Sequence, residues 1–278
     1  MSPGELAILT ACAAAAGAVN ALAGGGMLVA YPVLVAFGLS PIAANATATV
    51  ALLSGGIGAQ LGYRKEMRGS GAFMRGLVVP CIVGGILGAF LLLRTPPRRF
   101  AAMVPGLVLL ATLLFSAQAQ ITRLAVRIHA RLTGLNASAL SAESTFEAPA
   151  APTWTLLAAQ LAISIYIGYF GAGAGALMLA NFGFAGLLNI HQMNGLKLWS
   201  GMLTNVTAAL IFALQPTLVS WPMALVMTFG SIAGGYLSSR VAQRVSQRSV
   251  RLTIIGIGVA MAVWLAVSAI AARPAGTG

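Results

Sequence analysis

Long apolar runs dominate this chain and leave few folds open to it. One run covers residues 5–37, and others follow at 42–62, 72–93 and 100–117. A helix needs about 20 apolar residues to cross a bilayer, and its backbone groups must bond within the segment. The runs are continuous rather than alternating, which favours helices over strands. Charged residues make up 7% of the chain, against about 25% in soluble domains. The sequence therefore predicts an all-α membrane protein.

The second half of the chain repeats the first. A long apolar segment at 154–185 is followed by spans at 190–214, 217–239 and 250–271. Two homologous halves with about eight transmembrane helices are typical of transporters. Matching residues recur at a nearly constant spacing: Gly17, Gly24 and Met27 match Gly168, Gly175 and Met178, Gly84 and Gly85 match Gly234 and Gly235, and Asn45 falls opposite Asn194.

A long polar stretch, residues 118–153, separates the halves. Arg123, Arg127 and Arg131 recur every four residues between apolar residues, which indicates a basic amphipathic helix lying on the membrane surface. Residues 133–153 are rich in Ala, Ser, Thr and Pro and predict a flexible linker. The predicted organisation is a first membrane repeat (1–117), an amphipathic segment with a linker (118–153) and a second membrane repeat (154–278).

The basic residues indicate how the halves face. If the glycine-rich break in each half turns the chain back, each half makes an odd number of passes. The clusters at 64–75, 123–131 and 240–251 then share one side of the membrane, as the positive-inside rule requires. With an even number of passes, the basic residues divide almost equally between the two sides of the membrane. We therefore expect inverted repeats, with both termini outside and a cytoplasmic linker. The formal charge of +12 then reflects cytoplasmic loops, not nucleic-acid binding.

Glycines interrupt the first apolar segment of each half. Where a helix stops and restarts, its first N–H groups lack partners and bind anions readily. Such breaks at matching positions point to a transporter's binding site. The alternative is that the glycines serve close helix packing alone. The glycines concerned are Gly24, Gly25 and Gly26 in the first half, and Gly171, Gly173 and Gly175 in the second.

Lys197 interrupts the predicted span at 190–214. It is flanked by Leu196 and Leu198, and an unpaired charge at membrane depth is costly. We therefore predict that Lys197 binds an anion that is not part of the protein. The alternative is that the side chain snorkels to the membrane interface. The acids of the chain, which lie at the N-terminus or in polar connections, are Glu5, Glu66, Glu143 and Glu147.

Neutral polar residues on the predicted spans could orient the same anion. Alternatively, the threonines bond to their own helix backbone, and Asn45 and Asn194 hold helices together. The candidates are Asn45, Thr47, Thr49, Asn194 and Asn205.

Enzymes and metalloproteins need residues that this chain lacks. It has two cysteines, Cys12 and Cys81, two histidines, His129 and His191, and no Asp. Neither a metal cluster nor a catalytic triad can be assembled from them. We expect no enzymatic activity and no cofactor. An intramembrane enzyme or assembly factor would need a catalytic cluster.

One motif runs from Gly17 to Thr47, and a second joins Gly168–Gly175 to Asn194-Gly-Leu-Lys197. Both resemble motifs of the sulfite exporter TauE/SafE family of bacterial anion permeases. The resemblance implies a multi-pass inner-membrane permease for sulfite, organosulfonates or related carboxylates, without a cofactor. We expect a secondary transporter working by alternating access, with a small-molecule anion and the lipid bilayer as partners and a homodimer as candidate assembly. The alternative is an anion channel.

Overall fold

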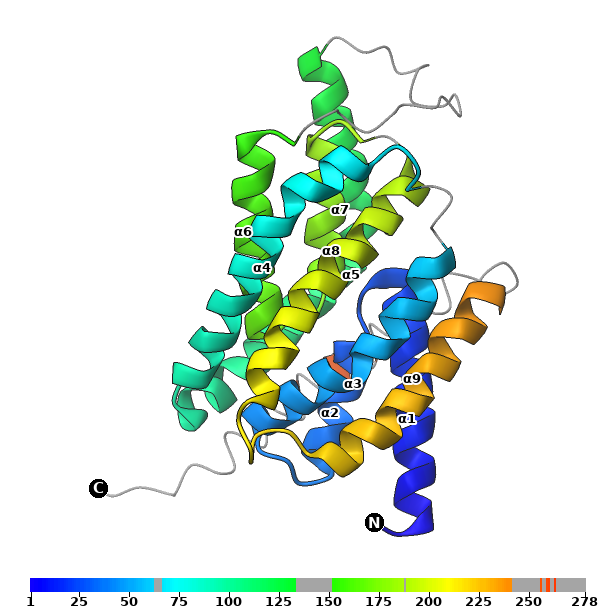
Figure 1. The fold of residues 1–278 in the computed structure, drawn as a ribbon, viewed down its shortest axis with the longest axis vertical. Coiled ribbons are helices and arrows are strands. Elements are labelled where there is room, and N and C mark those ends of the chain that lie inside the picture. The colour runs from blue at the N-terminus through cyan, green and yellow to red at the C-terminus, as the bar shows by residue number, and fades with distance from the viewer. Residues whose placement is uncertain are drawn as a thin grey trace.

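The computed structural model describes residues 1–62, 67–133, 152–187 and 189–241, together with 256, 259, 260 and 263. The described part is built of helices joined by short turns (Figure 1). The helices are α1 (Pro3–Ala23), α2 (Met27–Ala36), α3 (Pro41–Gly62), α4 (Gly71–Arg94), α5 (Pro97–Thr133), α6 (Trp154–Tyr169), α7 (Ala174–Phe184), α8 (Ile190–Ala213) and α9 (Trp221–Val241).

This architecture confirms the predicted all-α membrane protein. Within the described residues, segments of α1, α4, α5 and α8 are long and apolar enough to cross a membrane. The first apolar segment of each half is divided in two, as predicted, into α1 with α2 and α6 with α7. The predicted last span at 250–271 lies almost wholly outside the described residues.

Local sequence explains where the helices begin. The Ser2 hydroxyl accepts a hydrogen bond from the Glu5 N–H at 3.3 Å, and the Glu5 carboxylate accepts one from the Ser2 N–H at 2.7 Å. This reciprocal pair caps α1. Asn189 caps α8 by accepting the N–H of His191 at 2.9 Å.

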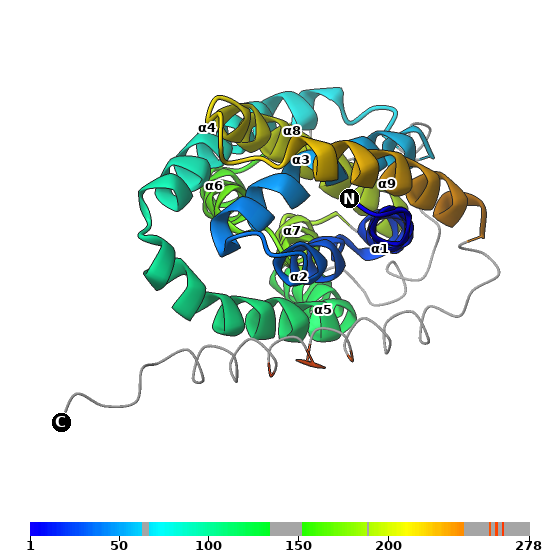
Figure 2. The same cartoon turned by 90° about the horizontal axis from the view of Figure 1, so that it is seen from below.

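The two halves are interleaved. α1 packs along α9, and α4 packs along α6. Because α1 and α6 open their respective halves, each half places its first helix against a later helix of the other. The short helices α2 and α7 lie inside the bundle, between α5 on one side and α3 and α8 on the other (Figure 2).

Glycines make these helix contacts close. Gly84 on α4 faces Ser164 on α6, and Gly234 on α9 faces the backbone of Ala14 on α1, with no room for a β-carbon at either glycine. The two contacts occupy equivalent places, since Gly84 matches Gly234 and Ala14 matches Ile165, whose backbone N also lies beside Gly84. The matched glycines of the sequence therefore perform the same packing task in both halves.

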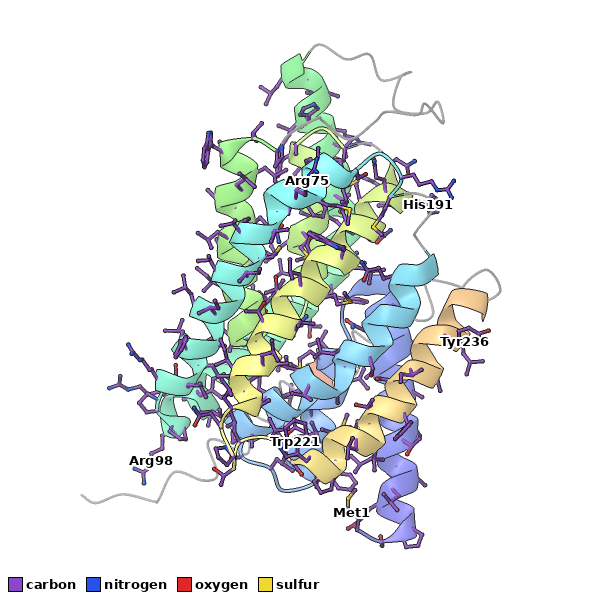
Figure 3. The ribbon with its side chains drawn as sticks, in the orientation of Figure 1. Met1, Arg75, Arg98, His191, Trp221 and Tyr236 are labelled. Carbon is purple, nitrogen blue, oxygen red and sulfur yellow. The ribbon has the colours of Figure 1, made fainter. Side chains whose placement is uncertain are left out.

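Equivalent helices run in opposite directions. α4 begins near Arg75 at one end of the molecule and ends shortly before Arg98 at the other (Figure 3). α9 begins at Trp221, near the end that carries Arg98, and runs back toward Tyr236. Met1 also lies at the end that carries Arg98.

The basic segment differs from the sequence-based expectation. α5 continues without a break to Thr133, so Arg123 and Arg131 lie on its last turns instead of on a separate surface helix. The reason is tertiary packing. Ala125 is buried, and its β-carbon lies beside Gly183 of α7. The apolar side of the amphipathic segment therefore covers protein rather than lipid.

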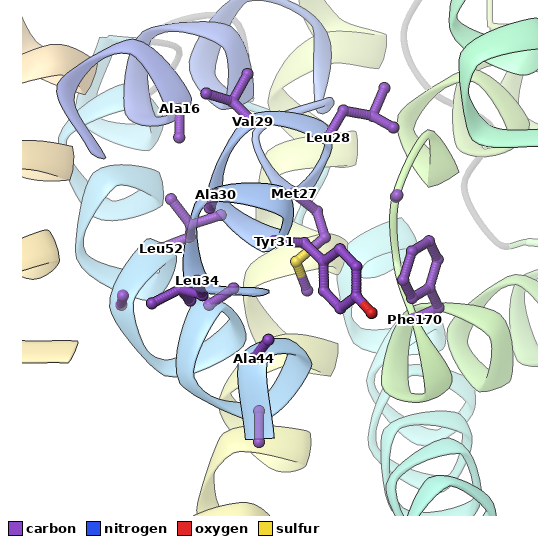
Figure 4. Packing of buried hydrophobic residues seen from close by; sticks show 14 of the residues in the cluster. Ala16, Met27, Leu28, Val29, Ala30, Tyr31, Leu34, Ala44, Leu52 and Phe170 are labelled. Carbon is purple, nitrogen blue, oxygen red and sulfur yellow. The ribbon is translucent and has the colours of Figure 1, made fainter. Parts of the chain in front are cut away.

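Aromatic packing joins α2 to the break of the other half. Tyr31 is 1% exposed and meets Phe170 edge to face, with ring centroids 5.6 Å apart (Figure 4). Phe100 of α5 packs on Phe170 from another element, at 6.3 Å. These contacts fix the turn between α6 and α7 beside the first half.

Candidate functional site

The two predicted breaks face each other. Gly24, directly after α1, has φ 75°, and Gly171 and Gly173, between α6 and α7, have φ 74° and 73°. This left-handed backbone is readily adopted by glycine. A β-carbon on Gly24 would lie 3.2 Å from the Cα of Gly175. The structure therefore brings the glycine segments of both halves into contact.

The start of α7 offers a free backbone donor. α7 begins at Ala174, after its N-cap Gly173. The N–H of Gly175 donates to no acceptor among the described residues, as expected in the first turn of a helix. Gly175 lines the cavity described next.

A cavity of about 90 Å³ lies where the breaks meet α3 and α8. Most of its lining residues fall into pairs related by the internal repeat, so equivalent parts of the two halves line the cavity together. The pairs are Asn20 with Gly171, Gly24 with Gly175, Met27 with Met178, Thr49 with Leu198, Leu52 with Gly201, Leu53 with Met202 and Gly56 with Asn205.

Among the described residues that line the cavity, Lys197 carries the one charged side chain. It is 3% exposed, and its Nζ donates to Asn194 Oδ1 at 2.9 Å. In the described part of the chain the acid is Glu5, which caps α1, so no carboxylate there pairs with Lys197. The side chain ends inside the protein, against the snorkelling alternative. Ala48 occupies the repeat-related position on α3, so the first half has no charge at the position equivalent to Lys197.

Several predicted site residues do lie together. Thr49 and Asn205 both line the cavity, but Thr49 Oγ1 donates to Asn45 O at 2.8 Å and Asn205 Nδ2 donates to Gly201 O at 2.9 Å. Each side chain therefore donates one hydrogen bond to a carbonyl of its own helix. For Thr49 this is the alternative in which threonines bond to their own helix backbone. Asn194 stays outside the lining and contacts it through Lys197. The predicted residues that line the cavity are Gly24, Gly171, Gly175, Thr49, Lys197 and Asn205.

Asn45 and Thr47 instead connect the two halves. Asn45 Nδ2 donates to the carbonyl of Tyr169, at the end of α6, at 3.0 Å. Thr47 Oγ1 accepts the N–H of Ser220, directly before α9, at 3.0 Å. Asn45 therefore matches the helix-joining alternative in this conformation, whereas Thr47 bonds to the other half and not to its own helix backbone as its alternative supposed. Gly25, Gly26 and Gly173 also lie outside the cavity lining.

Asn20 belongs to the cavity and was missed in the sequence. It lies one turn before Gly24 on α1 and lines the cavity. Its side chain forms no hydrogen bond with the described residues. The available signal was its spacing: residues four apart share a helix face, so a polar residue four positions before a break points toward the same space.

Comparison with known proteins agrees with this architecture. The family model for the sulfite exporter TauE/SafE matches residues 9–265. The chain is 24% identical over 260 residues to a probable membrane transporter protein, ORF9, from Sinorhizobium sp, covering 94% of this chain and 92% of that protein. It is 25% identical over 261 residues to the probable membrane transporter protein YfcA of Escherichia coli strain K12, covering 94% and 89%. No solved structure matches.

The family model covers almost the whole chain, including both glycine breaks and Lys197. The similar proteins align with both halves, and both carry the name of a membrane transporter. The protein is accordingly a multi-pass membrane transporter, and the chain belongs to the sulfite exporter TauE/SafE family.

Proposed function

We propose that this protein is a secondary transporter of small anions, such as sulfite, organosulfonates or related carboxylates, in the bacterial inner membrane. The observation that carries the proposal is Lys197. This residue is 3% exposed and lines a cavity between two helix breaks, and its ammonium group has no described carboxylate partner. A buried charge without a counter-charge is costly, and a bound anion would remove that cost.

The size of the cavity supports a small substrate. Its volume is about 90 Å³, whereas pockets for drug-sized ligands hold roughly 300–1,000 Å³. An anion with few heavy atoms fits this space. The Gly175 N–H and the free hydrogens of Lys197 offer donors for its oxygens.

We further propose that the halves are inverted repeats that alternate around the cavity. The opposite directions of α4 and α9 support this (Figure 3), as does the exchange of α1 and α6 between the halves. In such transporters the substrate lies between the repeats, and access alternates as one repeat moves against the other. The paired lining of the cavity fits that arrangement.

Ligand-dependent thermal stability tests the site. Small anions would be added one at a time to the purified protein in detergent, covering sulfite, sulfate, organosulfonates and short carboxylates. A ligand that binds the folded state alone stabilises it by about 2.7 kcal/mol at 100 times its Kd. We expect at least one anion to raise the Tm of the wild type but not that of Lys197→Ala.

Arg75→Gln provides the matched control, because it removes one positive charge from an exposed position outside the cavity. It should respond to the anion as the wild type does. An equal Tm shift in Lys197→Ala would refute the role of Lys197. Counterflow of a labelled anion in proteoliposomes then separates the two transport classes, because a carrier exchanges substrate across the membrane whereas a channel passes current without exchange.

A further inference from the structure

We infer that the cavity selects anions with a single negative charge, and that Asn20 is the second side chain, beside Lys197, that holds them. This inference rests on the proposed function and goes beyond it by naming the charge and the shape of the substrate.

The number of charges in the described lining favours a substrate with one negative charge. The described lining comes from α1, α2, α3, α6, α7 and α8, and Lys197 is the one titratable side chain in that part of the lining. The repeat could have supplied a second cation on α3, but Ala48 stands there. One ammonium balances one negative charge. A second negative charge would remain uncompensated inside the protein.

The helix ends do not change this balance. At the first break the C-terminal end of α1 lies beside the N-terminal end of α2, and at the second break α6 ends where α7 begins. A helix carries about half a positive charge at its start and half a negative charge at its end. Each break therefore contributes individual N–H donors but almost no net charge.

Asn20 supplies hydrogen bonds from the opposite half. Asn20 lines the cavity, and its side-chain amide makes no hydrogen bond with the described residues, whereas the amide of Asn205 donates to Gly201 O. Asn20 thus has both amide hydrogens available. Lys197 has two hydrogens left after its bond to Asn194. These two side chains, on α1 and α8, bring one anion into contact with both halves.

The rest of the lining is largely apolar. Met27 of α2, Met178 of α7 and Leu53 of α3 contribute to it. Methionine adapts its shape to small groups. The substrate class that fits is a small singly charged oxyanion with a short uncharged end, such as an alkanesulfonate or a monocarboxylate.

Methanesulfonate and sulfate form a matched pair of probes. Both are tetrahedral at sulfur, but a methyl group in methanesulfonate replaces one charged oxygen of sulfate. We expect methanesulfonate to bind the wild type at least roughly tenfold more tightly, measured by titration calorimetry in detergent at pH 7 and constant ionic strength. This comparison needs no variant, so it stands even if a substitution impairs folding.

Variants of Asn20 test its role. Asn20→Ala should weaken methanesulfonate binding by roughly three- to tenfold through loss of hydrogen bonds. Asn20→Lys adds a second positive charge to the cavity and should reverse the preference in favour of sulfate. Ala102→Lys adds the same charge at an exposed position near Arg98 and should leave the preference unchanged.

The possible results distinguish a failure of the single-charge inference from a failure of the proposed anion site. If sulfate binds as tightly as methanesulfonate and both depend on Lys197, the single-charge inference is wrong while the proposed anion site stands. If Asn20→Ala binds methanesulfonate like the wild type, the role of Asn20 is wrong. If no anion in the wider panel binds the wild type, the proposed function fails, and the inference fails with it.

Discussion

Asn45 joins the two halves of the molecule through a single side chain. It is 1% exposed, and its amide donates to the backbone of Tyr169, at the end of α6. A carbonyl left without a donor in such a place costs free energy. The residue thus holds α3 of one half in register with the break of the other.

Replacing Asn45 tests this role. Asn45→Ala should lower the free energy of unfolding by about 1–3 kcal/mol, seen as a lower Tm of the ligand-free protein in detergent. Thr10→Ala is the control, because it removes an exposed hydroxyl that bonds within α1 and should change the Tm little. An unchanged Tm in Asn45→Ala would show that the bond does not stabilise the fold.

Six of the twelve site residues predicted from the sequence line the cavity. Lys197 was predictable because a charged residue is rare in an apolar span. Gly24, Gly171 and Gly175 were predictable because glycine often marks the place where a helix is interrupted. Asn45 and Thr47 could not be separated from Thr49 and Asn205, because composition does not tell which face of a helix meets the cavity. Asn20 was missed for the same reason, although its spacing from Gly24 was visible.

The helix pairs α1 with α9 and α4 with α6 depend on the absence of side chains. Gly84 and Gly234 meet neighbouring helices without room for a β-carbon, whereas a β-carbon on Gly106 of α5 would meet nothing within 4 Å. Overpacking a close contact costs about 1–3 kcal/mol. Replacing glycine by alanine should therefore lower stability at the close contacts of α4 and α9, and should not lower it at Gly106 of α5.

Alanine at these glycines tests the two helix pairs. Gly84→Ala and Gly234→Ala should each lower the Tm by several degrees and reduce anion counterflow, because the paired helices are forced apart. Gly106→Ala should keep or raise the Tm, since alanine favours the helix. Similar Tm values for all three variants would contradict the packing argument.

The positions of the helices were predictable from hydropathy, but the point at which α5 ends was not. The expected spans at 42–62, 72–93 and 190–214 lie within a few residues of α3, α4 and α8, because membrane thickness limits helix length. α5 was expected to end near residue 117 but reaches Thr133. The cause is its packing on α7, a contact between distant parts of the chain that periodicity does not reveal.

At the scale of the whole molecule, the described basic residues include members at both ends. Arg75 lies at one end and Arg98 at the other (Figure 3). The positive-inside rule places the more basic end in the cytoplasm. Together with the sequence count of basic residues, the rule predicts that the end that carries Arg75 is cytoplasmic.

Labelling of single cysteines tests this orientation. In a variant lacking Cys12 and Cys81, Arg98→Cys should react with a membrane-impermeant maleimide in intact cells, and Arg75→Cys should react only after the cells are opened. Both positions are exposed. Labelling of both positions in intact cells would contradict a single orientation with opposite ends.

The exchange of first helices between the halves has a consequence for how the protein is made. α1 is complete after Ala23, but its main partner, α9, begins at Trp221. At about 5–20 residues per second the ribosome needs roughly 10–40 s to make the residues between them. During that time the face of α1 that packs on α9 lacks its protein partner and must be covered by lipid or the insertion machinery. The final packing of the first half therefore waits until the second half has been made.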